Sequence, residues 1–142
     1  MMEEAIRNAI EQAVEKEPFA QALSIKLVTL EFGHSVVEMA YAPSTMANIY
    51  GRAHGGAIFA LIDEAFETAG QTDGTIAVAL NVNVTYVSSP EDGTRLRAEA
   101  RLVSQTKRTA NYDIRVTDSD GTLIATCQAL AYRTGKPIPF LK

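Results

Sequence analysis

A polar loop that runs into an apolar helix carries the groups best suited to chemistry in this sequence. The stretch Asn48–Gly56 holds a histidine followed by two glycines, and residues 57–62 are all apolar before Asp63. A helix that begins at Gly55 leaves its first backbone N–H groups unpaired at the positive end of the helix dipole, where they suit a developing negative charge. Gly55 is therefore a candidate oxyanion donor, and Gly56 would let a substrate approach the backbone closely.

A carboxylate inside that apolar helix needs a role or a partner, since an unpaired buried charge is costly. Phe59 and Phe66 stand four residues before and three residues after Asp63, so we expect them to enclose it. Desolvation there would raise the pKa of Asp63 and make it a stronger base. We interpret Asp63 as a general base or a nucleophile, with a solvated carboxylate at the helix edge as the plainer alternative.

The other polar residues near this helix each have two interpretations. His54 is favoured as a residue that caps the helix and orients the loop, over direct proton transfer. Asn48 either caps its own loop or holds the attacking water or the carbonyl. Glu67 lies one turn beyond Asp63 and is most simply a polar position near the helix end. Glu64 is turned by about 100° from Asp63, and we interpret it as structural or interfacial.

The composition limits the class of protein. The chain has 142 residues, of which 46% are hydrophobic and 21% charged, a balance typical of one globular domain. A net charge of −4 disfavours a nucleic-acid surface, and no apolar run reaches the ~18 residues that span a bilayer. The N-terminus lacks a signal-peptide layout and Cys127 is the only cysteine, so we expect a cytoplasmic protein. No metal-ligand cluster is apparent, and no cofactor is expected.

The elements that must position these groups follow from the hydrophobic periodicity. The spacing predicts a surface helix over 3–17, strands over 25–32 and 35–42, a loop over 43–53, a helix over 55–69 and four further strands, the first over 75–88. One face of that long strand is expected to carry Val78, Leu80, Val82, Val84 and Tyr86. One apolar helix among antiparallel strands favours an α+β fold in which a sheet wraps around the helix.

At this point a family resemblance is visible. The motif Gly51-x-x-His54-Gly55-Gly56, with an acid nine residues after the histidine and Asn48 six residues before it, resembles the hotdog-fold acyl-CoA thioesterases of the phenylacetate-degradation (PaaI-like) group. Three downstream segments are similar to that family's central strand and turn, its next strand and its hairpin: Asn83–Gly93, Arg97–Arg101 and Lys107–Ala110. The resemblance implies a single hotdog domain over 1–142, with a core over roughly 19–134.

The resemblance also implies an activity, the hydrolysis of an acyl-CoA thioester to a carboxylic acid and free CoA. The Gly55 N–H would polarise the carbonyl, and Asp63 would activate water or attack first to form an anhydride; both routes stay open. Another hotdog subgroup uses the position of Glu67 for a water-binding side chain. Lys107 and Arg108, in a hairpin, are candidate partners for the phosphates of coenzyme A.

Two departures from the family's pattern bear on rate and acyl preference. The basic residue common just before Pro90 is replaced by Ser88 and Ser89, and Ala79 stands where some relatives place a Ser or Thr that assists the reaction. The acyl group, aromatic or aliphatic, therefore stays open.

The distance between the two reactive groups requires a second subunit. Gly55 and Asp63 are eight residues apart in one helix, so their backbones lie ~12 Å apart along its axis. A carboxylate must come within ~3 Å of the water it activates, and that water must reach the same carbonyl carbon. Two antiparallel copies of the helix can meet this condition. We therefore expect a homodimer at the least, with shared sites, and leave a homotetramer open. The resemblance implies that the long strand over 75–88 joins the two sheets.

Two other functions compete with this interpretation. A hotdog hydratase or dehydratase would need a His–acid pair that converges on a β-carbon, and the His54–Gly56 loop fits a thioesterase better. A non-catalytic acyl-CoA-binding module would leave Asp63 without a role.

Overall fold

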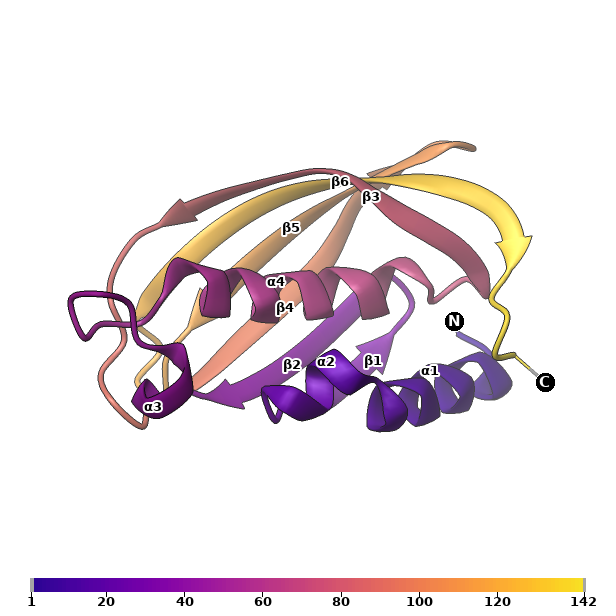
Figure 1. The fold of residues 1–142 in the computed structure, drawn as a ribbon. Helices are drawn as coiled ribbons and strands as arrows, with labels where there is room; N and C mark the ends of the chain where they lie inside the picture. The colour runs from indigo at the N-terminus through magenta and orange to yellow at the C-terminus, as the bar shows by residue number, and fades with distance from the viewer. Residues whose placement is uncertain (1, 142) are drawn as a thin grey trace.

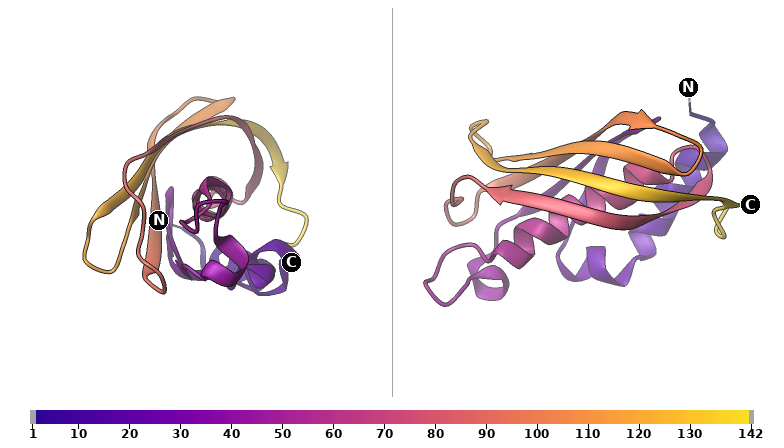
Figure 2. Two further views of the ribbon diagram at one scale, coloured as in Figure 1. Left: turned by 60° about the vertical axis from the view of Figure 1, so that its left-hand side comes forward. Right: turned by 90° about the horizontal axis from the view of Figure 1, so that it is seen from above.

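Six strands form one antiparallel sheet that curves around a long helix (Figures 1 and 2). The computed structural model describes residues 2–141. The strand order is β1-β2-β4-β5-β6-β3. The elements are α1 (Glu4–Lys16), α2 (Pro18–Ala22), β1 (Lys26–Glu31), β2 (His34–Ala40), α3 (Pro43–Met46), α4 (Gly55–Gly70), β3 (Thr75–Tyr86), β4 (Arg95–Gln105), β5 (Thr109–Thr117) and β6 (Leu123–Pro137). The expected α+β class, with a sheet wrapped around a helix, is confirmed.

Helix α4 lies in the concave side of the sheet (Figure 2, left). Leu61, Ile62 and Ala65 are fully enclosed, and they join a core to which the sheet contributes Val37 and Ile114. Full burial of a large aliphatic side chain contributes about 1.5–3 kcal/mol, so this helix and the sheet stabilise one another. The apolar character of α4 on most of its sides follows from this central position.

The sheet has one buried face and one solvated face. In β4, Leu96, Ala98 and Ala100 are fully buried, while Arg97 and Arg101 between and after them are exposed. This alternation is the pattern of an antiparallel sheet that covers a core on one side only.

The expected apolar face of β3 is wrong at its first residue. Val78 pairs with Tyr132, whereas Val82 pairs with Ala129, and the register shifts between Ala79 and Asn81. The extra residue in this β-bulge reverses the alternation, so Val78 lies on the opposite face of the sheet from Val82. β3 is also an edge strand that pairs only with β6.

The N-terminal helices pack beneath the opening of the sheet (Figure 1). α1 confirms the surface helix expected over 3–17, and it buries Ile6, Ile10 and Val14 at helical spacing. The loop expected over 43–53 differs in one respect, because it contains the four-residue helix α3. None of the helices within residues 2–141 is long and apolar enough to cross a membrane.

Candidate active site

The start of α4 is capped by the histidine that precedes it. The Gly56 N–H donates to His54 Nδ1 over 2.8 Å, and the Ala57 and Ile58 N–H groups donate to the His54 carbonyl oxygen over 3.0 and 3.4 Å. His54 is thus the N-cap of the helix. Of the first four N–H groups of α4, that of Gly55 is the one without an acceptor in residues 2–141. A hydrogen-bond donor at the positive end of the helix dipole is therefore available to a ligand.

The side chain of Tyr86 closes one side of this helix start. Its hydroxyl donates to the Gly55 carbonyl oxygen over 3.0 Å. A Cβ atom at Gly55 would lie 3.2 Å from the Tyr86 ring and hydroxyl, so the glycine permits this close approach. This role of Tyr86 was not predicted from the sequence, although its place on the expected apolar face of the strand could have indicated it.

Asn48 holds the shape of the loop that leads to the helix. Its Oδ1 accepts hydrogen bonds from the backbone N–H groups of Tyr50 and Arg52, over 2.9 and 3.0 Å. This is the loop-capping alternative of the two that the sequence left open. The side-chain NH₂ of Asn48 donates to no group within residues 2–141, so the two alternatives are compatible.

These groups line one pocket of about 440 Å³. Its lining includes Asn48, Arg52, Gly55, Tyr86 and Ser89. Arg52 Nε donates to Ser89 Oγ over 2.9 Å, which brings a guanidinium beside the position where the family's basic residue is replaced by serine. The pocket therefore combines an unpaired backbone donor with a positive charge.

Asp63 lies in a second pocket, of about 260 Å³, together with Glu67, Ala77 and Ala79. The expectation that aromatic residues bury Asp63 is wrong for the single chain, in which the residue is exposed. The pocket lies between α4 and the edge strand β3, and the Asp63 carboxylate in it is open to solvent. Desolvation by the atoms packed around it, and then the charge of Glu17, still raise the pKa of Asp63.

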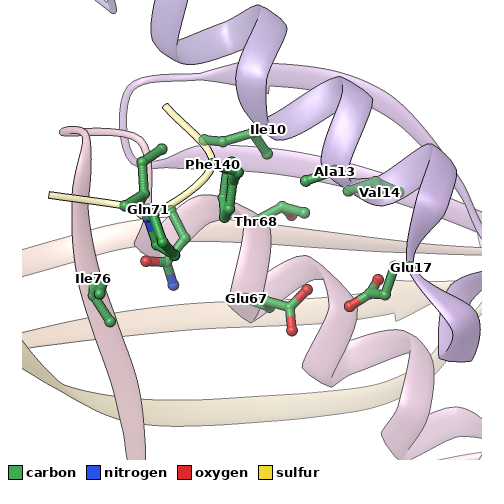
Figure 3. Close-up of a pocket in the computed structure, with 11 residues that line it drawn as sticks. Ile10, Ala13, Val14, Glu17, Glu67, Thr68, Gln71, Ile76 and Phe140 are labelled. Atoms are coloured by element: carbon green, nitrogen blue, oxygen red, sulfur yellow. The ribbon is translucent and has the colours of Figure 1, made fainter. Parts of the chain in front are cut away.

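The buried acid of α4 is Glu64, which is only 3% exposed. Helical rotation turns Glu64 away from Asp63 and toward Glu17, the residue that connects α1 to α2. Desolvation, followed by a hydrogen bond with Glu17, raises the pKa of Glu64 to about 9 and that of Glu67 to about 8. Figure 3 shows the Glu17 and Glu67 carboxylates facing one another in a third pocket, of about 460 Å³, between α1 and α4. This group of acids was not predicted from the sequence, because Glu17 is distant from Glu64 and Glu67 along the chain.

Lys107 and Arg108 are not brought to either of the first two pockets. They lie in the hairpin between β4 and β5, where an Arg108 Nη1 donates to the Tyr132 hydroxyl over 3.2 Å. Tyr132 pairs with Val78, so this hairpin lies beyond the first half of β3 and away from Gly55. Within one chain, Lys107 and Arg108 are thus separate from the unpaired Gly55 N–H.

The two halves of the predicted site are separate in one chain. The pocket at Gly55 and the pocket at Asp63 share no lining residue. Both residues belong to one uninterrupted helix, so the ~12 Å separation along its axis holds.

A curved antiparallel sheet wrapped around one central helix is the architecture of hotdog-fold proteins. The model of the thioesterase superfamily matches residues 50–125, which include the start of α4 and Asp63. A putative esterase of Archaeoglobus fulgidus is 33% identical over 119 residues, which cover 84% of this chain and 77% of that protein. The acyl-coenzyme A thioesterase PaaI of Escherichia coli is 31% identical over 124 residues, which cover 87% of this chain and 88% of that enzyme. The chain therefore belongs to the thioesterase superfamily, as a PaaI-like hotdog thioesterase.

Solved structures agree with this assignment. The structure of the E. coli PaaI protein superimposes with a TM-score of 0.91 at 28% identity, over 97% of this chain and 99% of that chain. A Streptococcus mutans protein bound to acetyl CoA is 30% identical, with a TM-score of 0.75 over 80% of this chain and 91% of that chain.

Proposed function

We propose that this protein hydrolyses acyl-CoA thioesters to a carboxylic acid and free CoA, at active sites shared between two subunits. The observation that carries the proposal is the unpaired Gly55 N–H at the start of α4, which opens onto a pocket of about 440 Å³. Membership of the thioesterase superfamily supports the reaction class. The name of the E. coli relative and the acetyl CoA in the S. mutans structure support CoA thioesters as substrates.

The proposed reaction begins with the thioester carbonyl oxygen on the Gly55 N–H. The Asp63 carboxylate of the other subunit takes a proton from water while the water oxygen attacks the carbonyl carbon. The Gly55 N–H and the helix dipole stabilise the oxyanion of the tetrahedral intermediate. The C–S bond then breaks, the carboxylic acid forms and the thiolate of CoA leaves and takes up a proton. In the alternative route, the Asp63 carboxylate attacks the carbonyl carbon itself, and the C–S bond breaks to give a mixed anhydride and the thiolate of CoA. Water then hydrolyses the anhydride to the carboxylic acid and restores the Asp63 carboxylate, and the proton released passes to the thiolate.

A second subunit is proposed because each chain supplies only half of this site. An antiparallel copy of α4 would bring the Asp63 of one chain beside the Gly55 of the other. The free edge of β3, with Val78 and Leu80 47% and 57% exposed, is the surface through which the two sheets would join. A homotetramer built from two such dimers stays a prediction, as does the cytoplasmic location.

The remaining residues have supporting roles in this proposal. The free NH₂ of Asn48 would hold the attacking water or the carbonyl, and His54 keeps the helix start in shape by its bond to Gly56. Glu67, beside Asp63, would bind water. For the CoA phosphates, Arg52 supplies a cation at the Gly55 pocket. Lys107 and Arg108 lie away from this pocket in the same chain. They would contact the CoA phosphates either from the partner subunit or where the flexible CoA molecule extends to them.

The test is the release of free thiol from a panel of acyl-CoAs by the wild-type protein and by Gly55→Pro. Proline removes the N–H and is tolerated in a first helical turn, so we expect a loss of ~3 kcal/mol in transition-state stabilisation with the fold retained. Gly55→Ala is the matched control, since it adds a Cβ against Tyr86 but keeps the N–H. If Gly55→Pro and Gly55→Ala have equal activities, the Gly55 N–H does not stabilise the oxyanion, and the oxyanion site lies elsewhere. A wild-type protein that binds acyl-CoA without thiol release would instead support a binding module or a hydratase.

A further inference from the structure

Three glutamates from two distant parts of the chain meet where the N-terminal helices pack on α4. Glu17 lies between α1 and α2, and Glu64 and Glu67 lie on α4. One carboxylate oxygen from each lies within 4.8 Å of the other two. We propose that this cluster, the glutamate triad, binds a divalent cation, and that Ca²⁺ fits it best.

The burial of Glu64 is the independent observation that points to a ligand. Glu64 is 3% exposed, and its enclosed Oε2 accepts from no N–H or hydroxyl group in residues 2–141. The Oε1 of Glu17 is enclosed and lacks such a donor in the same way. The hydrogen bond between these two acids needs a proton that they share. An enclosed carboxylate oxygen without a donor destabilises the fold. Because both residues belong to the triad, one bound cation would compensate both.

The surroundings of the triad supply no positive side chain. Among the residues that the structure describes, every ion pair is formed by other acids: Glu4, Glu31, Glu38, Glu99, Asp73 and Asp113. The charged groups that act on Glu64 are Glu67, Glu17 and Asp63, all of them acidic. A cation from solution is therefore the charge that the triad lacks.

The donor set favours Ca²⁺. Carboxylate oxygens suit Mg²⁺, Ca²⁺ and Mn²⁺ rather than softer metals. Mg²⁺ keeps several waters and binds through one or two carboxylates, whereas Ca²⁺ accepts a larger and more flexible set of carboxylate oxygens. Three glutamates, with one oxygen of each within 4.8 Å of the other two, match the second description. The adjoining pocket of about 460 Å³, which Glu17 and Glu67 help to line, has room for the water that would complete the coordination (Figure 3).

A cation at this position would act on the fold. It would join Glu17, at the junction of α1 and α2, to Glu64 in the buried part of α4. The N-terminal helices would then be fixed to the core by metal bonds in addition to the packing of Ile10 and Val14. This inference does not depend on the proposed thioesterase activity.

The test is isothermal titration of the chelator-treated protein with CaCl₂, alongside thermal unfolding with and without Ca²⁺. We expect one Ca²⁺ per chain, and at 100 times the Kd a rise in Tm of ~5–10 °C. Glu17→Gln and Glu64→Gln should each weaken binding by about tenfold or more. Glu15→Gln is the matched control, because it makes the same charge change at an exposed position of α1.

Two results would overturn the proposal. The first is a wild-type protein that binds no Ca²⁺, Mg²⁺ or Mn²⁺ at millimolar concentration and keeps the same Tm, which would mean that protons alone neutralise the triad. The second is an equal loss of affinity in Glu15→Gln and Glu17→Gln, which would indicate diffuse attraction to an acidic surface. If Glu64→Gln does not fold, the affinity of Glu17→Gln still tests the proposal. Glu17 is only half-buried, so this variant should fold.

Discussion

At the scale of single residues, rotation around α4 separates two carboxylates that are adjacent in sequence. Asp63 opens onto a pocket beside β3, while Glu64 is enclosed against Glu17. The two side chains point about 100° apart, so one helix turn carries both an accessible acid and a buried one. The proposed chemistry on a ligand therefore uses Asp63, and the proposed cation site is built around Glu64.

The first prediction concerns Asp63. Asp63→Asn should lower kcat for acyl-CoA hydrolysis by ~10²–10⁴, the usual scale for loss of a general base. Because Asp63 is exposed in the single chain, the substitution should leave unfolding unchanged. Steady-state thiol release and thermal unfolding measure the two effects. Asp92→Asn, in an exposed turn, is the control that should keep wild-type turnover. A folded Asp63→Asn protein with normal kcat would remove Asp63 from the reaction.

At the scale of elements, the short connection after α4 fixes β3 relative to the helix. The Gln71 side chain exchanges two hydrogen bonds of 3.0 Å with the backbone of Ala77. Asp73 accepts from Thr75 and forms an ion pair of 2.9 Å with Arg133 on β6. The connection thus joins α4, β3 and β6, and holds the two walls of the Asp63 pocket in register.

The second prediction is a pH dependence at this connection. Desolvation opposes ionisation of Asp73, but hydrogen bonds from Thr75 and Arg133 outweigh it and hold its pKa below the usual range. Since the folded pKa lies below the unfolded pKa of ~3.9, the stabilisation is complete above that value and is lost as the pH falls through the folded pKa. Asp73→Asn should therefore cost about 1–3 kcal/mol at neutral pH.

Urea unfolding of the Asp73→Asn protein and the wild type at pH 7 and pH 3 measures this effect. The stability difference between them should narrow at the lower pH. Asp120→Asn, in the exposed turn before β6, serves as the control and should show no such narrowing. A difference that stays constant between the two pH values would mean that the ionised form of Asp73 is not what stabilises the connection.

At the scale of the whole molecule, the proposal of a shared site predicts complementation between inactive subunits. Asp63→Ala and Gly55→Pro chains, once mixed and exchanged, form dimers in which one site has both lesions and the other has neither. Random exchange makes half of the dimers mixed, each with one intact site of two, so activity should return to about a quarter of wild type.

Mass spectrometry of isotope-labelled chains would establish that exchange has taken place. Each parent alone should stay inactive through the same treatment, which controls for refolding. Confirmed mixed dimers without recovered activity would mean that one chain supplies both groups or that another residue pair reacts.

The sequence by itself determined the elements and the chemistry that depends on neighbours along the chain. Periodicity located the helix over 3–17, the helix over 55–69 and the strand over 75–88 to within two residues at each end, because helix and strand repeats are local properties. The free N–H at Gly55 was also predictable, since a helix start leaves it unpaired wherever the helix lies.

Only the tertiary structure decided which side of α4 is buried and what faces it. The helix is apolar on most sides, so its periodicity did not distinguish the exposed Asp63 from the buried Glu64. The bulge in β3 depends on its pairing with β6, and the contact of Tyr86 with Gly55 depends on how the sheet curves over the helix. The contact of Glu17 with the other two glutamates likewise depends on packing between distant elements. Such packing leaves no periodic signal in the local sequence, so none of these contacts could be predicted from it.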